Sequence, residues 1–289
     1  MPSIAMQMAP WLLPAMRRRY LGSAAPVVDL RSFDARELPP ALARDHPSEQ
    51  ARPGGATGTW LHPERRANGA LVFLHGGAYV FGPGPGHWEW LCAMSDATGM
   101  AALMLMYDRA PEARFPTALE QVVAACADLE GPWLLAGDSA GGGLAIAAAM
   151  RMRDEGAPLP RALLLSSPWL DLTLSHPGLV ANASGDVMLG AERLGAYARD
   201  YAGDADLRDP LISPAFGDAQ GLPPMLITVG GAELMLFEIR DWAAACAAAG
   251  TPCELIEVDG AIHDFAMART LFPEAREVFP RMAEFALGP

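Results

Sequence analysis

The sequence is poor in cysteine and has no long apolar run, and each shortage narrows the class of protein. Only four of the 289 residues are cysteine, at Cys92, Cys126, Cys246 and Cys253. Their positions fit neither a disulfide scaffold nor a zinc site, so we expect reduced core thiols and no metal. No run of 18 apolar residues is present, so a membrane-spanning helix is not expected.

Basic residues are also scarce: the chain has 21 Lys and Arg against 34 Asp and Glu, which gives a formal net charge of −13. Nucleic acids and anionic membrane surfaces repel an acidic protein, so we expect small neutral molecules as partners. The apolar stretch 10–16 precedes Arg17, Arg18 and Arg19. This is the reverse of the charge order in a signal peptide, which favours a cytoplasmic protein.

Beyond about residue 50 the chain alternates between strand-like and helix-like stretches. The strand-like runs are 57–61, 70–74, 101–106, 133–136, 162–166, 225–229 and 254–258. This alternation predicts an α/β fold with a mainly parallel, doubly wound sheet covered by helices on both faces. With 51% hydrophobic residues, the chain is long enough for one such domain.

Two segments depart from the alternation, and we expect both to form a cap. Residues 1–50 begin with an apolar, helix-like stretch that must cover another surface. Residues 172–208 contain a loop and then an amphipathic stretch with Leu194 and Tyr197 at helical spacing. Both segments are expected to roof the carboxyl ends of the strands in the main domain, 51–289, where open α/β sheets bind ligands. The alternative is that the second helix packs into the core and has no role as a lid.

The pentapeptide 137–141 (GDSAG) follows the apolar run 133–136 and precedes a helix-like stretch. Strand, sharp turn and helix in this order are typical of a nucleophile elbow, and Ser139 would then need a base beside it. Such an elbow needs glycine at positions 137 and 141, because side chains there would collide where strand and helix converge. The alternative is a glycine-rich turn that binds phosphate on helix amides, but the P-loop lysine is missing.

The turn His75-Gly76-Gly77 closes another apolar run and offers hydrogen-bond donors. The amides of Gly76 and Gly77 can approach a substrate oxygen because no side chain obstructs them, and the amide of Ala140 adds a third donor. These amides predict an oxyanion hole. We expect His75 to brace the turn rather than to take part in chemistry.

Chain order indicates the base and the acid. On this type of fold the serine comes first, the acid second and the histidine last. Only His176 and His263 follow Ser139, and only His263 lies beyond the last strand, so it is the expected general base. Glu233 comes just after a strand, as a carboxylate that holds an imidazole must, and is the expected acid. Glu238, in the helix that follows, is the alternative.

Aromatic and apolar residues near these motifs are the expected walls of a substrate pocket. They are Tyr79 and Trp88 after the glycine turn, Trp11 and Met16 in the N-terminal segment, and Leu194 and Tyr197 in the inserted one. Tyr79 and Trp88 could equally belong to the core.

With these residues placed, the chain resembles the hormone-sensitive-lipase-like branch of the α/β-hydrolase carboxylesterases, especially its small bacterial members. The matching segments are 75–78 (HGGA), 107–112, 115–116, 137–142 (GDSAGG), 167–171 (SPWLD), the Glu233 segment and 263–265 (HDF). The resemblance implies an eight-stranded α/β-hydrolase sheet with a helical cap, and hydrolysis of carboxylic esters without a metal or organic cofactor. Short- to medium-chain acyl esters are the expected substrates, and a homodimer is left open.

The sequence departs from this family's pattern at four places, one of which is the pair Asp108-Arg109 where Arg-Leu is more usual. Ala78 replaces the third glycine of the usual motif, and Glu233 stands where many relatives carry aspartate. Asp264 replaces a frequent glycine and puts a negative charge beside the base. Two alternatives remain: an amidase or arylformamidase with the same triad, and a receptor on the same fold that has lost a triad member. All three triad members can be assigned here, which disfavours the receptor.

Overall fold

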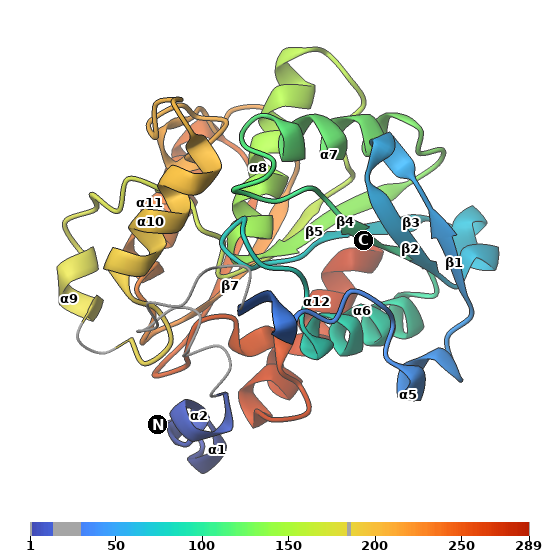
Figure 1. The fold of residues 1–289 in the computed structure, drawn as a ribbon, viewed down its shortest axis with the longest axis horizontal. Helices are drawn as coiled ribbons and strands as arrows, with labels where there is room; N and C mark the ends of the chain where they lie inside the picture. The colour runs from blue at the N-terminus through green and yellow to red at the C-terminus, as the bar shows by residue number, and fades with distance from the viewer. Residues whose placement is uncertain (1, 14–29, 184–185, 289) are drawn as a thin grey trace.

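A computed structural model of the chain describes residues 2–13, 30–183 and 186–288 (Figure 1). Its centre is an eight-stranded sheet with the strand order β1-β2-β4-β3-β5-β6-β7-β8. Strand β2 pairs antiparallel with β1 and β4, and the pairings from β4 to β8 are parallel. The strands are β1 (Ser48–Ala51), β2 (Thr57–Leu61), β3 (Ala70–Leu74), β4 (Ala101–Met106), β5 (Trp133–Asp138), β6 (Leu163–Ser166), β7 (Met225–Gly230) and β8 (Cys253–Val258). The predicted α/β sheet is therefore confirmed.

Seven of these strands coincide with the predicted runs to within two residues. The eighth, β1, is not among those runs because its residues are polar and three of its four positions are exposed. It forms the edge of the sheet and spans the predicted boundary at residue 50. The sheet thus begins within residues 1–50, the segment predicted to form the N-terminal cap.

Helices cover both faces of the sheet, as Figure 1 shows. Helices α7 (Thr117–Ala127) and α8 (Ser139–Asp154) lie on one face, and α6 (Pro85–Thr98) and α12 (Pro273–Leu287) lie on the other. Helix α11 (Leu236–Ala249) packs near β7 and β8 at the far end of the sheet. None of the helices in the described part of the chain combines the length and apolar character that crossing a bilayer requires.

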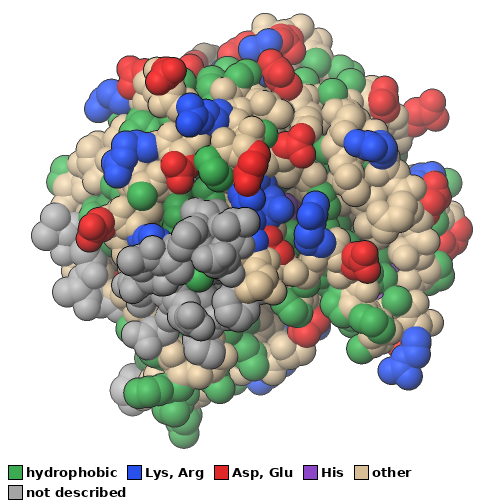
Figure 2. All heavy atoms as spheres, viewed as in Figure 1, with side chains coloured by type: hydrophobic (Ala, Val, Ile, Leu, Met, Phe, Trp, Pro, Cys, Tyr) green, Lys and Arg blue, Asp and Glu red, His purple; other side chains and the backbone are tan. Residues whose placement is uncertain are grey.

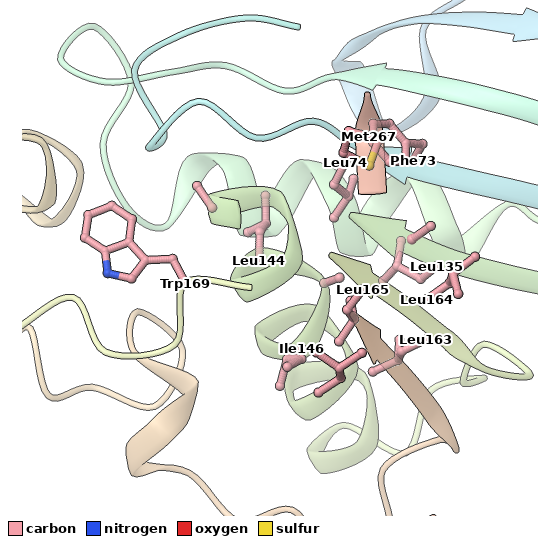
Figure 3. Packing of buried hydrophobic residues seen from close by; sticks show 14 of the residues in the cluster. Phe73, Leu74, Leu135, Leu144, Ile146, Leu163, Leu164, Leu165, Trp169 and Met267 are labelled. Carbon is pink, nitrogen blue, oxygen red and sulfur yellow. The ribbon is translucent and has the colours of Figure 1, made fainter. Parts of the chain in front are cut away.

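The core between α8 and the sheet is built from aliphatic side chains. Figure 3 shows Leu144 and Ile146 of α8 near leucines of the strands, among them Leu135 and Leu165. All four side chains are fully buried, and burial of each contributes roughly 1.5–3 kcal/mol to stability. This packing fixes the start of α8, where Ser139 lies.

The four cysteines are free thiols, as the sequence predicts. Cys92, Cys126 and Cys246 are buried, whereas Cys253 is half-buried. Burial raises the pKa of Cys92 and of Cys126 to about 12, so both are uncharged thiols at neutral pH.

The N-terminal residues form two short helices, α1 (Ile4–Gln7) and α2 (Ala9–Leu12), that lie against the C-terminal part of the chain. Ser3 donates hydrogen bonds from its amide and hydroxyl to Glu274 at the start of α12. The outer side of these helices is apolar, and Figure 2 shows hydrophobic atoms gathered at this corner. The expected continuation of the helix to Met16 and Tyr20 lies outside the described residues.

The inserted segment contains α9 (Leu179–Ala183) and α10 (Ala191–Ala202). The ring of Tyr201 stacks on that of Tyr79 with centroids 3.7 Å apart, and Tyr197 meets Phe81 edge to face at 5.4 Å. Helix α10 therefore packs on the loop that follows the His75 turn. Asp186 also binds the amide of Leu234, which ties the insertion to the segment that carries Glu233.

Candidate active site

Ser139 lies at a sharp turn between β5 and α8. Its φ angle is 50°, in the left-handed region that non-glycine residues rarely adopt. A Cβ atom added to Gly141 would lie 2.0 Å from the carbonyl oxygen of Leu74, and one added to Gly137 would lie 2.5 Å from that of Gly141. The prediction that these two glycines leave no room for a side chain is confirmed. Strand and helix converge here, and the turn holds the serine in its strained conformation.

The structure brings Ser139, His263 and Glu233 into one chain of contacts. The Oγ atom of Ser139 lies 2.9 Å from Nε2 of His263, and Nδ1 of His263 lies 2.6 Å from Oε2 of Glu233. Their exposed fractions are 7%, 3% and 0%, respectively. A nucleophile, a base and an orienting acid at hydrogen-bonding distance are the arrangement that activates a serine.

Glu233 is held rigidly by groups that the sequence did not single out for this task. Its Oε1 atom accepts hydrogen bonds from the Ser167 hydroxyl at 2.7 Å and from the Gly230 amide at 2.5 Å. Oε2 is thereby directed at His263. Ser167 belongs to a segment of the family pattern, 167–171, and that membership was the one signal that could have pointed to it.

The two alternative residues lie elsewhere. Glu238 is buried, and its Oε1 accepts hydrogen bonds from the amides of Leu170 at 2.8 Å and Asp171 at 3.3 Å. Burial raises the pKa of Glu238 to about 8, so it is mostly a neutral acid at pH 7. His176 pairs at 2.9 Å with Asp241, near the surface.

Asp264 lies directly against the expected base. Its Oδ2 atom is 3.2 Å from Nε2 of His263, the same nitrogen that faces Ser139. The prediction that this carboxyl group lies beside the base is therefore confirmed. Burial opposes protonation of His263, but the carboxylates of Asp264 and Glu233 outweigh it and raise its pKa well above the ordinary value. Burial also raises the pKa of Asp264, to about 7, so the two groups titrate as a pair.

Removal of the Asp264 charge is expected to move the acidic limb of the kcat/KM profile to lower pH. A raised His263 pKa keeps the imidazole protonated, and thus unable to act as a base, up to a higher pH. Asp264→Asn and Asp264→Gly both suit the local backbone, which has φ 56°. The measurement is the pH profile of ester hydrolysis for both variants. The exposed Asp259→Asn serves as a charge-matched control, and a limb that stays in place in both Asp264 variants would contradict the prediction.

The glycine turn differs from the prediction at one donor. The amide of Gly76 donates to Oδ1 of Asp138 at 2.8 Å, so it is engaged within the protein. Oδ2 of the same carboxylate lies 2.9 Å from Nε2 of His87. The amide of Ala140 belongs to the first turn of α8, where amides have no acceptor within the helix, and this leaves Gly77 and Ala140 as the better placed donors.

His75 braces the turn, as expected. Its ring stacks on Tyr107 with centroids 4.5 Å apart, and the Tyr107 hydroxyl donates to the His75 carbonyl oxygen at 2.6 Å. Burial lowers the pKa of His75 to about 3, so the ring is neutral. The backbone of the turn is therefore fixed by packing and by several buried hydrogen bonds, among them those from the Tyr107 hydroxyl and the Gly76 amide.

A pocket of about 420 Å³ reaches His263, Asp264 and the glycine turn. This volume is in the range of small-molecule sites. Its apolar wall comes from the N-terminal helix and from the segment before α12, and consists of Leu12, Leu13, Ile262, Met267, Leu271 and Phe272.

The predicted pocket walls need correction, because the five described ones do not line this pocket. Tyr79 and Tyr197 are buried where α10 packs on the loop after the glycine turn, and Leu194 is buried on α10. Trp88 is fully buried with its indole N–H bonded to the Ala35 carbonyl oxygen. Trp11 points outward and is 74% exposed. The sixth, Met16, lies outside the described residues.

Comparison with known proteins identifies the family. A family model described as the alpha/beta hydrolase fold matches residues 71–267. An acetyl-hydrolase of Streptomyces hygroscopicus is 39% identical over 236 residues, which cover 80% of this chain and 79% of that protein. An esterase of Acinetobacter venetianus is 31% identical over 256 residues, covering 85% and 84%.

Solved structures agree with this assignment. An esterase of the bacterial hormone-sensitive lipase family superposes with a TM-score of 0.88 at 31% identity, covering 99% of this chain and 98% of that one. The esterase EstE5, from a crystal soaked with p-nitrophenyl butyrate, gives a TM-score of 0.87 at 30% identity with the same coverage. The chain therefore belongs to the α/β-hydrolase family. Within it, the chain is a member of the bacterial hormone-sensitive-lipase-like branch of serine ester hydrolases.

Proposed function

We propose that Ser139, His263 and Glu233 form the catalytic triad of a carboxylesterase. Ser139 attacks the ester carbonyl while His263 takes its proton and returns it to the leaving alcohol. Glu233 holds the imidazole and stabilises the imidazolium. Water then attacks the acyl-enzyme while His263 takes its proton, and the Ser139 oxygen leaves and receives that proton from His263 as the acid is released. The observation that carries this proposal is the buried run of contacts from Ser139 through His263 to Glu233, at 2.9 and 2.6 Å.

The negative charge that develops on the carbonyl oxygen needs donors that are already in position. We assign this role to the amides of Gly77 and Ala140, with that of Gly76 available only if Asp138 releases it. Gly77 has φ 120°, and a Cβ there would lie 2.5 Å from the Phe81 carbonyl oxygen. A side chain at this position would displace the donor, so glycine is required.

Short- to medium-chain acyl esters fit the pocket best. Each methylene that finds an apolar wall gains roughly 0.8 kcal/mol, and one that does not fit gains nothing or clashes. Leu12 and Leu13 end the N-terminal helix at this wall, so the part of residues 1–50 that precedes β1 is assigned to the cap. None of residues 172–208 lines this pocket, and their assignment to the cap remains a prediction. The butyrate ester used with the related EstE5 has an acyl chain in this range.

The rate on aryl esters is expected to rise with acyl length to an optimum at about four to eight carbons and then to fall. Leu13→Trp would fill part of the pocket beside its apolar wall and move the optimum to shorter acyl chains. The measurement is kcat/KM over a series of p-nitrophenyl esters, with the exposed Leu287→Trp as a control. Hydrolysis of emulsified long-chain triglycerides as fast as of butyrate esters would contradict the confined pocket.

The same triad would also cleave an amide, so an amidase or arylformamidase activity is the second candidate. A panel of paired esters and anilides with identical acyl groups separates the two. The esterase proposal predicts turnover of the esters far above that of the anilides, and loss of both in Ser139→Ala. Preference for the anilides would overturn it. A cytoplasmic location remains a prediction from the sequence, and a homodimeric assembly remains open.

A further inference from the structure

The structure assigns a second site, distinct from the ester-hydrolysing one: a divalent transition-metal site formed by His46, His62 and Asp96. Zn²⁺ is the ion that this set of two imidazoles and one carboxylate suits best. His46 follows the short helix α5 (Pro40–Ala43), His62 follows β2, and Asp96 lies near the end of α6. The three side chains come from separate elements, so no spacing along the sequence predicts that they meet.

The three possible ligand atoms form a triangle of the right size. Nδ1 of His46 and Nε2 of His62 are 3.1 Å apart, and Oδ1 of Asp96 lies 3.8 Å and 3.6 Å from them. Zinc bonds of 2.0–2.2 Å at tetrahedral angles separate ligand atoms by roughly 3.3–3.5 Å. A shift of a few tenths of an ångström would therefore place all three atoms around one ion. Imidazole nitrogen is a ligand that zinc, nickel and copper share.

The surroundings prepare His62 for this role. Its Nδ1 atom lies 3.0 Å from a carboxylate oxygen of Glu64, so Nδ1 carries the ring proton and donates a hydrogen bond to that oxygen. The lone pair on Nε2 then points toward His46 and Asp96. A carboxylate behind a ligating histidine is the usual means of fixing its tautomer and orientation. His62 also has φ 48° although it is buried, a conformation in which histidine, asparagine and aspartate are enriched.

Burial and access also fit a bound ion. His46 and His62 are buried, whereas the Asp96 side chain is 53% exposed and leaves a path for the ion and for a water as fourth ligand. The guanidinium of Arg65 lies 3.5 Å from the Asp96 carboxylate. It competes with a cation for that carboxylate, and its charge weakens the site.

The proposed metal site and Ser139 lie at opposite ends of the strands of the sheet. Strand β2 runs antiparallel to β4 with Leu61 beside Ala102, so His62 is near the amino end of β4, whereas Ser139 follows the carboxyl end of β5. Figure 1 shows α5 and β1 on the side of the molecule away from α9 and α10. An ion here would join the edge strands to α6, and its effect would be on stability rather than on ester hydrolysis.

The test is a titration of the full-length, chelator-treated protein with Zn²⁺, followed by calorimetry and by the thermal midpoint. We expect one equivalent to bind and to raise the Tm, as ligands of the native state do, with the rate of ester hydrolysis unchanged. Co²⁺ is expected to give the visible absorption of a four-coordinate ion with nitrogen and oxygen ligands. We expect zinc binding to weaken about tenfold or more in each of the variants His46→Gln, His62→Asn and Asp96→Asn. Loss of a group that merely orients a ligand already lowers metal affinity by about this factor.

Two further variants protect the conclusion from effects on folding. Arg65→Gln is expected to bind Zn²⁺ more tightly, an outcome that a damaged fold would not produce. His176→Gln removes a histidine that also faces a carboxylate, at 2.9 Å, and is expected to bind like the unaltered protein. Zinc binding of equal stoichiometry and affinity in His46→Gln, His62→Asn and the unaltered protein would overturn the assignment, as would a failure of the unaltered protein to bind Zn²⁺ or Co²⁺.

Discussion

Replacement of Ser139 by alanine is expected to lower ester hydrolysis by about 10⁴-fold or more, and His263→Ala is expected to do the same. The two losses are similar because members of a triad act as a unit: serine without its base is a poor nucleophile, and the base without serine has no proton to take. Residual turnover above water comes from the oxyanion donors and from binding. The measurement is kcat/KM on a butyrate ester with purified protein.

Folding is the control for this experiment. Ser139→Ala removes one hydroxyl from a buried turn, and the unfolding midpoint is expected to change little. His176→Ala removes the other histidine that follows Ser139 in the chain, and it is expected to leave activity intact because its partner is Asp241. Turnover near that of the unaltered protein in Ser139→Ala would refute the mechanism.

Glu233→Gln is expected to lower activity by roughly 10³- to 10⁴-fold, whereas Glu238→Gln is expected to change it only a few fold. An amide at position 233 cannot stabilise the imidazolium and favours the wrong tautomer of His263. Glu238 is mostly neutral at pH 7 and accepts hydrogen bonds from backbone amides through Oε1. Glutamine keeps the shape and this acceptor, so the second variant is a matched control for loss of a buried carboxyl.

Both glutamine variants are compared by kcat/KM and by the pH at which activity falls on the acidic side. Loss of the Glu233 charge is expected to lower the pKa of His263, so the acidic limb of the residual activity moves to lower pH. A large loss in Glu238→Gln with little effect of Glu233→Gln would reverse the assignment of the acid.

The fold and the contacts among Ser139, His263 and Glu233 could be predicted from the sequence because both rest on local rules. Buried parallel strands favour continuous apolar runs, as in β3 (ALVFL) and β4 (AALMLM), whereas β1, an exposed and mostly polar edge strand, has none. The elbow glycines are dictated by contact between backbones, as at Gly141. Chain order reduced the base to a choice between His263 and His176, and the position of Glu233 just after β7 set it apart from Glu238.

The pocket could not be predicted in the same way, because it depends on how separate segments meet. Leu194 and Tyr197 have the spacing of a helix face, but spacing does not say whether that face meets a ligand or another loop. The same limit applies to the Gly76 amide, whose acceptor on Asp138 lies 62 residues away in the chain. His46, His62 and Asp96 are likewise brought together by the fold alone.

Covalent labelling of Ser139 tests the central claim most directly. A fluorophosphonate reacts with a serine only when a base and an oxyanion hole activate it, so the adduct reports the working triad without assuming a substrate. We expect intact mass spectrometry to show a single adduct that a short-chain ester competes away, and peptide mapping to place it on Ser139. Labelling is expected to vanish in Ser139→Ala and to slow strongly in Glu233→Gln. An adduct on another residue, or equal labelling of Ser139→Ala, would contradict the account.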